Sequence, residues 1–390
     1  MLLARYARVL VPVVIVITLA AGEPATGGGD DLPPSVRATV TSWPMFRGDP
    51  QLTGVARSAL PEQLSVQWKF EAAEPITSSA AIVDGTVFVG CHDEWLYALS
   101  LDDGSLRWKY HAQGPVQSSP LAVGPIVVFG DDEGTIHAVE RSSGKVRWTY
   151  QTDGQVISSP NYQAGRVLVG SYDGCLYCLA GGDGKLIWKH KTDGYVHGAP
   201  GIRGDSALVA GCDERLHVVR LADGEAVTTV SMKSVSGSSP AVSDSLVFVG
   251  TYGNRVLGID IPAARIAWAF EDPDRQFPFM ASAAITPDAI VIGGRDKRVR
   301  SLDPTNGKDR WTFATGARVD SSAAIVGERV FVGSSDGVLY ELDLRSGREL
   351  WRFESGAPIT ASPAVAAARL IIGNEDGVLY CLGGAGKGSD

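Results

Sequence analysis

Short apolar runs, separated by turn residues, follow one another along most of the chain. In the first clear unit the runs cover residues 80–83, 86–89, 95–99 and 105–110, and the turns cover 84–85, 90–94 and 102–104. Valine, threonine and aromatic residues dominate the runs and Asp-Gly pairs mark the turns, a pattern typical of β-strands joined as hairpins. No segment after residue 63 has helical periodicity. Each unit is therefore predicted to form four antiparallel strands.

The unit repeats with a period of about 40 residues. Tryptophans recur in its last run at Trp68, Trp108, Trp148, Trp188, Trp268, Trp311 and Trp351, and Thr228 stands at the missing step. A second series in the same phase marks eight unit starts at Ser79, Ser119, Ser159, Ala199, Ser239, Ser282, Ser322 and Ser362. Four short strands at this period are typical of a propeller blade. The sequence therefore predicts an all-β, eight-bladed β-propeller of four-stranded antiparallel blades.

The two ends of the repeat region predict how the ring closes. The last unit, from about residue 360, has three runs and lacks a fourth. Residues 64–70 form a lone fourth run with no unit before it. Pairing this N-terminal strand with the last unit completes an eighth blade and removes the open edge between first and last blades. One closed propeller domain is expected over residues 64–390.

The segment before the propeller has the pattern of an export signal. Arg5 and Arg8 precede an apolar run at 9–21, followed by small residues, so residues 1–22 are predicted to be a signal peptide. The run is shorter than the ~20 residues of a spanning helix, and an uncleaved anchor is the alternative. Residues 23–42 are expected to be a flexible linker and 43–63 a lead-in segment. We expect an exported protein, in the periplasm or at the extracytoplasmic face of the membrane, with no integral membrane domain beyond this signal or anchor.

Charge excludes one class of partner. The chain carries 35 Lys and Arg against 44 Asp and Glu, a formal charge of −9. Nucleic-acid binding needs a basic face for the phosphates, so we expect no nucleic-acid partner.

A Gly-X-X-X-Trp motif in the fourth run carries a family resemblance. It occurs at 104–108, 144–148, 184–188, 307–311 and 347–351. The motif resembles the tryptophan-docking repeat of the pyrroloquinoline-quinone (PQQ)-like propeller superfamily, and residues 43–54 are similar to the segment that precedes those propellers. The resemblance implies that the seven tryptophans are structural docking residues. Thr228 departs from the pattern in blade 4, and Ala264 replaces the glycine in blade 5.

The resembled superfamily has two relevant branches. Quinoprotein dehydrogenases oxidise alcohols or sugars with PQQ and calcium, whereas other members, including the scaffold lipoprotein of the outer-membrane β-barrel assembly machine, are free of cofactor. This chain has no Cys-Cys pair, and its longest insertion into the repeat is three residues. The predicted innermost strand carries Ser, Gly, Ala and Pro. We therefore expect a non-catalytic protein with no cofactor and no metal site; the alternative is a PQQ- and calcium-dependent alcohol or sugar dehydrogenase.

Repeated polar residues and cysteines have structural explanations. Aspartates at 93, 173, 213, 296, 336 and 376 are expected to stabilise tight turns through their own backbone. Cys178 and Cys381 are expected to be small buried residues; disulfides joining Cys175 to Cys212, or Cys91 to Cys381, are the alternative. The six histidines have no ligand spacing, which argues against a zinc site. The serine pairs near each unit start are expected to serve packing at the axis, with a hydroxyl-lined channel as the alternative.

One loop departs from the repeat. Residues 271–280 replace the usual turn between the fifth and sixth units and carry the extra three residues. Because this loop joins a fourth strand to an innermost strand, it should lie at a mouth of the channel. Arg275, Phe277, Phe279 and Met280 have the composition of an interface anchor and are the predicted binding site. In the alternative, the loop folds onto its own blade with Phe277 or Phe279 buried.

These features predict a protein-binding scaffold in the cell envelope, with a protein or peptide partner. Alternatives are the dehydrogenase and a small-ligand sensor at the channel mouth. Carboxylates and aromatic side chains converging at one mouth would favour either ligand alternative, whereas a plain serine-lined channel would favour the scaffold.

Overall fold

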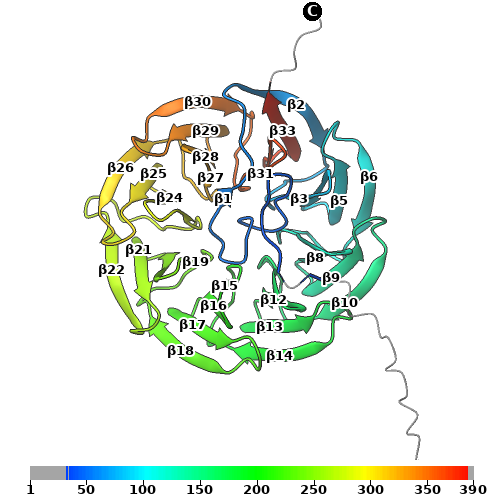
Figure 1. Cartoon of the computed structure of the whole chain (residues 1–390), viewed down its shortest axis with the longest axis horizontal. Coiled ribbons are helices and arrows are strands. Elements are labelled where there is room, and N and C mark those ends of the chain that lie inside the picture. The colour runs from blue at the N-terminus through cyan, green and yellow to red at the C-terminus, as the bar shows by residue number, and fades with distance from the viewer. Residues whose placement is uncertain (1–31, 34, 385–390) are drawn as a thin grey trace, which may run out of the picture.

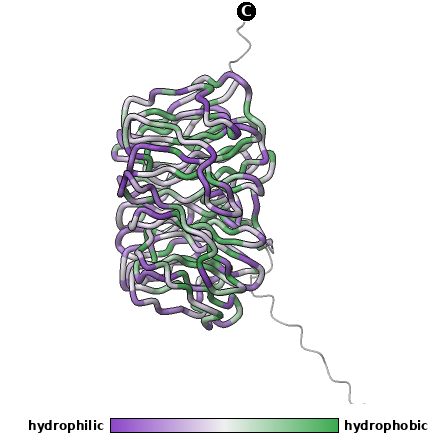
Figure 2. The backbone as a smooth tube through the Cα atoms, turned by 90° about the vertical axis from the view of Figure 1, so that its left-hand side faces the viewer, coloured by the Kyte–Doolittle hydropathy of each residue, from purple (hydrophilic) through white to green (hydrophobic). Residues whose placement is uncertain are grey.

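The computed structural model describes residues 32–33 and 35–384, which form a closed ring of eight β-sheets around a central axis (Figure 1). Seen edge-on, the ring is a thick disc (Figure 2). No helix in the described residues is long and apolar enough to cross a membrane. The predicted signal peptide (1–22) and the beginning of the predicted linker (23–42) lie outside the described residues.

Each blade has four antiparallel strands. The innermost strands are β3 (Ala81–Val83), β7 (Leu121–Val123), β11 (Asn161–Gln163), β15 (Gly201–Arg203), β19 (Ala241–Val242), β23 (Ala284–Ile285), β27 (Ala324–Val326) and β31 (Ala364–Ala366). The second strands are β4 (Thr86–Gly90), β8 (Ile126–Gly130), β12 (Arg166–Gly170), β16 (Ser206–Ala210), β20 (Leu246–Gly250), β24 (Ile290–Gly294), β28 (Arg329–Gly333) and β32 (Arg369–Gly373).

The remaining strands lie farther from the axis. The third strands are β5 (Trp95–Ser100), β9 (Thr135–Glu140), β13 (Cys175–Ala180), β17 (Arg215–Arg220), β21 (Arg255–Asp260), β25 (Arg298–Leu302), β29 (Val338–Asp343) and β33 (Val378–Gly384). The fourth strands are β6 (Leu106–His111), β10 (Val146–Gln151), β14 (Leu186–Lys191), β18 (Ala226–Ser231), β22 (Arg265–Glu271), β26 (Asp309–Ala314), β30 (Glu349–Glu354) and β2 (Leu64–Glu71). Blades 1 to 8 are numbered from β3.

Burial follows the position of a strand in its blade. All residues of β4 are buried, because its two faces pack against neighbouring blades, whereas β6 alternates between half-buried and exposed positions. The apolar runs of the second and third strands thus form the core between blades, and the fourth strands form the rim.

The ring closes as the sequence predicts. N-terminal β2 pairs antiparallel with C-terminal β33, in the sheet order β2-β33-β32-β31. The eighth blade therefore takes its fourth strand from the other end of the propeller.

The segment before β2 crosses the centre of the ring and contacts every blade (Figure 1). We call residues 38–58 the strap; it includes the short strand β1 (Val55–Ala56), which pairs in parallel with β27. The strap exchanges hydrogen bonds of 2.7 to 2.9 Å with Ile82, Ala122, Asn161, Ile202, Val242, Ile285, Ile325 and Ala367, one residue at the innermost strand of each blade in turn. It thereby satisfies edge groups that would otherwise face the channel.

A buried arginine holds the strap across the axis. Arg47 is buried and donates to the carbonyl oxygens of Ser322 (3.0 Å) and Ala283 (3.2 Å). Phe46 of the strap lines the bottom of the central channel. Residues 35–42, which the sequence assigns to the linker, also touch the ring: Ser35 bridges to Gln163, and Ala38 is buried. One mouth of the channel is therefore closed by the strap.

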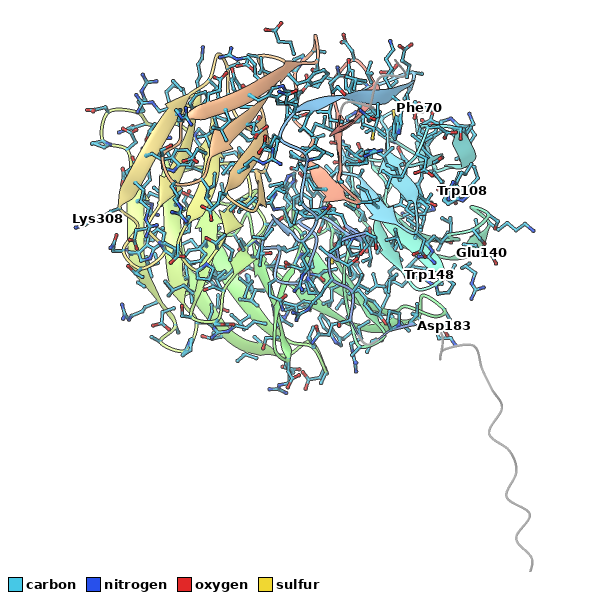
Figure 3. The ribbon with its side chains drawn as sticks, turned by 45° about the horizontal axis from the view of Figure 1, so that its top comes forward. Phe70, Trp108, Glu140, Trp148, Asp183 and Lys308 are labelled. Carbon is cyan, nitrogen blue, oxygen red and sulfur yellow. The ribbon has the colours of Figure 1, made fainter. Side chains whose placement is uncertain are left out.

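Tryptophans on the fourth strands dock on the next blade, as Trp108 and Trp148 do on the outer side of the ring (Figure 3). Indole N–H groups donate, at 2.8 to 3.0 Å, to the carbonyls of Leu101, Arg141, Gly181, Leu221, Pro304 and Leu344. Trp351 faces blade 8, whose third strand ends at Gly384, the last described residue.

A second contact series, which the sequence analysis missed, lies two residues beyond each tryptophan. Phe70 packs edge-on against Tyr97, and Phe313 packs in the same way against Tyr340 of the next blade. At the junction of blades 3 and 4 the pair is His190 and His217. The sequence signal was the aromatic residue that follows most of the tryptophans by two positions and so shares their face of the strand.

Candidate functional site

The central channel is lined by serines that hydrogen-bond around the axis. In seven of the eight steps a backbone N–H at the unit start donates to the hydroxyl at the next unit start, over 2.8 to 3.1 Å. The ring closes from Ser362 N–H to the hydroxyl of Ser79, and the step without such a bond leads from Ser159 to Ala199. These serines therefore join the blades as well as line a channel of about 160 Å³.

The open mouth lies at the end of the channel opposite the strap. The residues two positions before each unit start surround it: Thr77, Gln117, Ile157, His197, Gly237, Met280, Asp320 and Thr360. Loops between second and third strands add an outer ring, held by N–H bonds to the neighbouring connectors, at His92, Asp132, Tyr172, Cys212, Tyr252, Arg295, Ser335 and Glu375.

Aromatic side chains gather on the blade 3 to 5 side of this mouth. Tyr172 stacks on Tyr195 with ring centroids 4.8 Å apart, and Tyr195 is 55% exposed. The Tyr172 hydroxyl lies 2.6 Å from Nδ1 of His197. Burial lowers the pKa of His197 and raises the pKa of Tyr172 to about 12, so at neutral pH a protonated phenol and a neutral imidazole share this hydrogen bond. The stack is thus fixed in orientation while one ring faces solvent.

Two further side chains, Met280 and Tyr252, meet His197 where blade 5 has a glycine at the mouth. A Cβ on Gly237 would lie 2.8 Å from Met280 Cε, 3.4 Å from Tyr252 and 3.5 Å from His197. Tyr252 is 44% exposed, and burial of its other part raises the pKa of its hydroxyl. The absence of a side chain at Gly237 therefore leaves room for these three groups to converge.

The structure divides the predicted binding loop. Phe277 is 47% exposed, and Met280 lies at the mouth. Arg275 donates to the Asp296 carbonyl at 3.3 Å. Phe279, in contrast, is 1% exposed and packs edge-on against Phe270. For Phe279 the alternative interpretation holds: it is a core residue.

Phe279 turns inward because it holds the repeat position three residues before a unit start, which is buried in every blade, and buried charges add to its surroundings. The Arg300 guanidinium lies 5.6 Å from the Phe279 ring centre, donates to Asp296 Oδ1 at 3.1 Å and to Asp272 Oδ2 at 2.6 Å. Asp272 belongs to the loop itself, so this ion network ties the loop to blade 6. An aromatic ring over the guanidinium shields the network from water.

Charged side chains flank this aromatic group, in blade 2 on one side and in blades 6 and 7 on the other. Arg295 donates twice to Asp320, at 2.8 and 3.1 Å, which raises the pKa of Arg295. Arg318 lies 3.2 Å from the same carboxylate. Asp132 accepts from Gln117 at 2.6 Å, and burial raises the pKa of Asp132. Carboxylates and aromatic side chains therefore do converge at one mouth.

These carboxylates do not suit a calcium–quinone pair. Calcium takes six to eight oxygen ligands, but Asp320 is already neutralised by two arginines and Asp132 is bound by an amide. In the part of the chain that the structure describes, no three His, Cys, Asp or Glu side chains are grouped to hold a metal ion.

The repeated aspartates and the cysteines have structural surroundings. Asp93, Asp173, Asp213 and Asp336 each accept the backbone N–H two residues on, which holds the turn. All five cysteines lie within the described residues and are free, so the alternative disulfides do not form. Burial raises the pKa of Cys91, Cys178 and Cys381 to about 12, which keeps these thiols protonated and unreactive.

Sequence reasoning located the mouth through the 271–280 loop but missed the tyrosines. Tyr172, Tyr195 and Tyr252 occupy repeat positions at which other blades carry varied residues, so no motif marks them. The available signal was their place in the repeat, which puts all three at the same end of the ring.

Comparison with known protein families identifies one match along the propeller. A sequence-family profile described as "Outer membrane protein assembly factor BamB" matches residues 58–158, 122–229, 177–314 and 295–386. A curated relative, the serine/threonine-protein kinase AfsK of Streptomyces griseus, is 37% identical over 82 residues. That match covers 20% of this chain and spans a tenth of the length of the kinase.

Solved structures share the architecture at low sequence identity. BamB from Moraxella catarrhalis matches with a TM-score of 0.71 and 17% identity, over 83% of this chain and 100% of that one. Quinohemoprotein alcohol dehydrogenase from Comamonas testosteroni matches with a TM-score of 0.78 and 12% identity, over 90% of this chain and 82% of that one. These likenesses show that BamB and an alcohol dehydrogenase share this fold, and so leave function to be argued from the site.

Proposed function

The chain belongs to the family described as outer membrane protein assembly factor BamB, and from this premise we propose that it is a non-catalytic scaffold that binds a protein or peptide partner at the open mouth. We further propose that it is exported and works in the cell envelope, on the basis of its N-terminal sequence and this family.

The observation that carries the proposal is the group of exposed aromatic side chains at one mouth. Tyr195, Tyr252 and Phe277 are each between 44 and 55% exposed, and Met280 lines the channel and approaches Gly237 together with Tyr252. Tyrosine, methionine and arginine are enriched at protein interfaces, and a few such side chains carry most of the binding energy. Arg275, Phe277 and Met280 remain proposed contact residues, whereas Phe279 supports the loop from the core.

The test is a triple substitution at the mouth with a matched control at the rim. Tyr195→Ser/Tyr252→Ser/Phe277→Ser removes three exposed rings; Leu106→Ser/Val146→Ser/Leu186→Ser removes three exposed apolar side chains from fourth strands. Both variants should keep the wild-type melting temperature. Crosslinking in envelope extracts of the source cell should recover at least about tenfold less partner with the mouth variant, since interface anchors contribute on the order of 1–2 kcal/mol each. Equal recovery with both variants would overturn the mouth as the docking surface.

A small-ligand role is the second candidate, because carboxylates and aromatic rings meet at the same mouth. One form of this role is the PQQ- and calcium-dependent dehydrogenase, because this chain shares its fold with an alcohol dehydrogenase. A ligand that binds the folded protein must raise its melting temperature. A thermal-shift titration with PQQ and calcium, followed by dye reduction with alcohols and sugars, separates the two roles. A calcium-dependent shift with dye reduction would replace the scaffold by the enzyme; no shift at saturation favours the scaffold.

A further inference from the structure

One junction between blades has an empty docking slot at the rim. Between blades 4 and 5 a pocket of about 530 Å³ is lined by Leu208, Val218 and Thr228 of blade 4 and by Ile261, Pro262 and Ala264 of blade 5. Figure 1 shows the outer strands of these two blades, β18 and β22, as neighbours on the ring. Thr228 stands where the repeat has tryptophan, so this pocket occupies the place that an indole fills elsewhere.

The preceding junction shows what such a slot holds. Between blades 3 and 4, Trp188 packs with Leu168 and Leu221, which are the equivalents of Leu208 and Ile261 one period earlier. Its N–H donates to the Leu221 carbonyl at 2.9 Å. The slot between blades 3 and 4 therefore holds a bulky apolar side chain of the polypeptide.

The empty slot keeps the apolar walls. Leu208 and Val218 are buried, and Val227, at the edge of the pocket, is 53% exposed. Arg203 and Ser206 border the pocket, and Arg203 donates to the Asp244 carbonyl across the junction. An apolar recess with a polar border is the usual form of a site for a single anchoring side chain.

Three details make the slot unsuitable for an indole. At Gly224 an added Cβ would lie 2.7 Å from Trp188, and in blade 5 the equivalent residue is Ala264, which has that Cβ. The Ile261 carbonyl, equivalent to the acceptor of the indole N–H, already accepts the N–H of Ala264 at 3.0 Å. Val218 lies beside Thr228 where blade 3 has the smaller Cys178 beside Trp188.

We propose that the slot between blades 4 and 5 binds a branched aliphatic side chain, of leucine type, presented by another polypeptide. Such a group needs no acceptor and is not flat, so neither Ala264 nor the occupied Ile261 carbonyl opposes it. The turns that line the slot join first to second and third to fourth strands, at the end of the blades opposite the open mouth. The proposal therefore stands independently of the mouth.

The test uses small probes and methyl NMR on the whole protein. We expect 3-methylbutan-1-ol, a mimic of the leucine side chain, to shift the methyl signals of Leu208, Val218, Val227 and Ile261 in a saturable way. Indole should bind about tenfold more weakly, which corresponds to ~1.4 kcal/mol. Val218→Ala/Ala264→Gly should reverse this preference, because it restores the space over the turn.

A filled slot provides the matched control. Thr228→Trp/Ala264→Gly places an indole in the slot and should abolish the shifts from both probes while the other methyl signals stay unchanged. Absence of saturable shifts in the wild type, or their persistence in the filled variant, would overturn the site. Sedimentation velocity distinguishes the source of the side chain: self-association of the wild type that the filled variant lacks would assign the slot to a second copy and overturn the separate partner. The mouth substitutions leave this slot untouched, so either proposal can fail alone.

Discussion

Two neighbouring junctions of the same ring are built differently. Between blades 3 and 4, Trp188 lies over Gly224 and bonds to the next blade, and His190 packs edge-on against His217. Between blades 4 and 5 the corresponding residues are Thr228, Ala264, Val230 and Leu257. One junction is thus held at the rim by an indole and a ring pair, and the other by aliphatic contacts and by arginine hydrogen bonds to the carbonyls of Asp244 and Met232.

The comparison explains two sequence departures as one change. Gly224 has φ +79°, and any side chain there would meet the indole of Trp188. Where the tryptophan is lost, that constraint disappears, and Ala264 takes the position at φ +48°. The turn also shifts: Gly224 N–H bonds to Arg220, four residues back, whereas Ala264 N–H bonds to Ile261, three back. The glycine of the repeat is therefore required by the preceding blade.

The junction between blades 4 and 5, which lacks the indole at the rim, is still held together near the axis. Adjacent strap residues bridge it: the Pro50 carbonyl accepts from Ile202 of blade 4, and the Gln51 carbonyl accepts from Val242 of blade 5, both at 2.8 Å. Ala199 N–H also donates to the Ser239 hydroxyl at 2.8 Å. The ring can therefore lack one rim contact, because the strap and the serine ring keep the blades together at the centre.

The largest expected effect separates the two junctions directly. Trp188→Ala should lower the free energy of unfolding by about 3–5 kcal/mol, because a buried aromatic side chain leaves a cavity and an unpaired carbonyl at Leu221. Thr228→Ala should cost no more than about 0.5 kcal/mol, as at an ordinary surface position. Chemical denaturation of both variants measures the difference. Equal losses would mean that the blade 4–5 junction depends on Thr228 in a way that the aliphatic contacts do not reveal.

A smaller effect comes from rebuilding the missing dock. Thr228→Trp alone should destabilise, because the indole meets the Cβ of Ala264. With Ala264→Gly as well, we expect a net gain of about 1 kcal/mol and a coupling of about 1–2 kcal/mol between the sites. The gain stays below the loss at Trp188, because Val218 and the occupied Ile261 carbonyl persist. A double-mutant cycle measures the coupling, and additive single effects would contradict the matched change.

The repeat predicted the ring because its constraints recur in side chains. Each tryptophan and glycine reappears at a fixed step, and the unpaired run at residues 64–70 pointed to the closure that β2 and β33 make. The strap could not be predicted in the same way. Its contacts with the blades use mainly backbone groups, such as the carbonyls of Pro50 and Gln51, and these are present in any sequence.

The candidate site was less predictable than the fold. The departure from the repeat at 271–280 predicted a mouth, and Met280 of this loop lines the channel. Phe279 stands where most other units have Val or Ile, a signal of burial that the composition of the loop hid. Phe279 lies three residues before the unit start at Ser282, a position that is buried in every blade, and the Arg300 guanidinium packs against its ring. Phe277 lies two residues earlier and is 47% exposed. Exposure of Tyr195 depends on its stack with Tyr172, which lies in another loop.

The smallest expected effect is the pH dependence of stability that comes from the pair His190 and His217, between blades 3 and 4. Burial lowers the pKa of His190 in the folded protein below its usual value of 6.5, so the unfolded chain binds a proton first as the pH falls. Stability from neutral His190 is complete above about pH 6.5 and is lost as the pH falls toward the lowered pKa. His190→Phe, the residue found at Phe270 and Phe313, should remove this part of the acid dependence, on the order of a few tenths of a kcal/mol for a half-exposed ring. Unfolding free energies at pH 7.5 and 5.5 measure it, and an identical loss in both proteins would show that His190 is not sensed by the fold. Between blades 4 and 5 the equivalent residue, Val230, does not titrate. The variant would therefore make the two junctions alike in their response to pH.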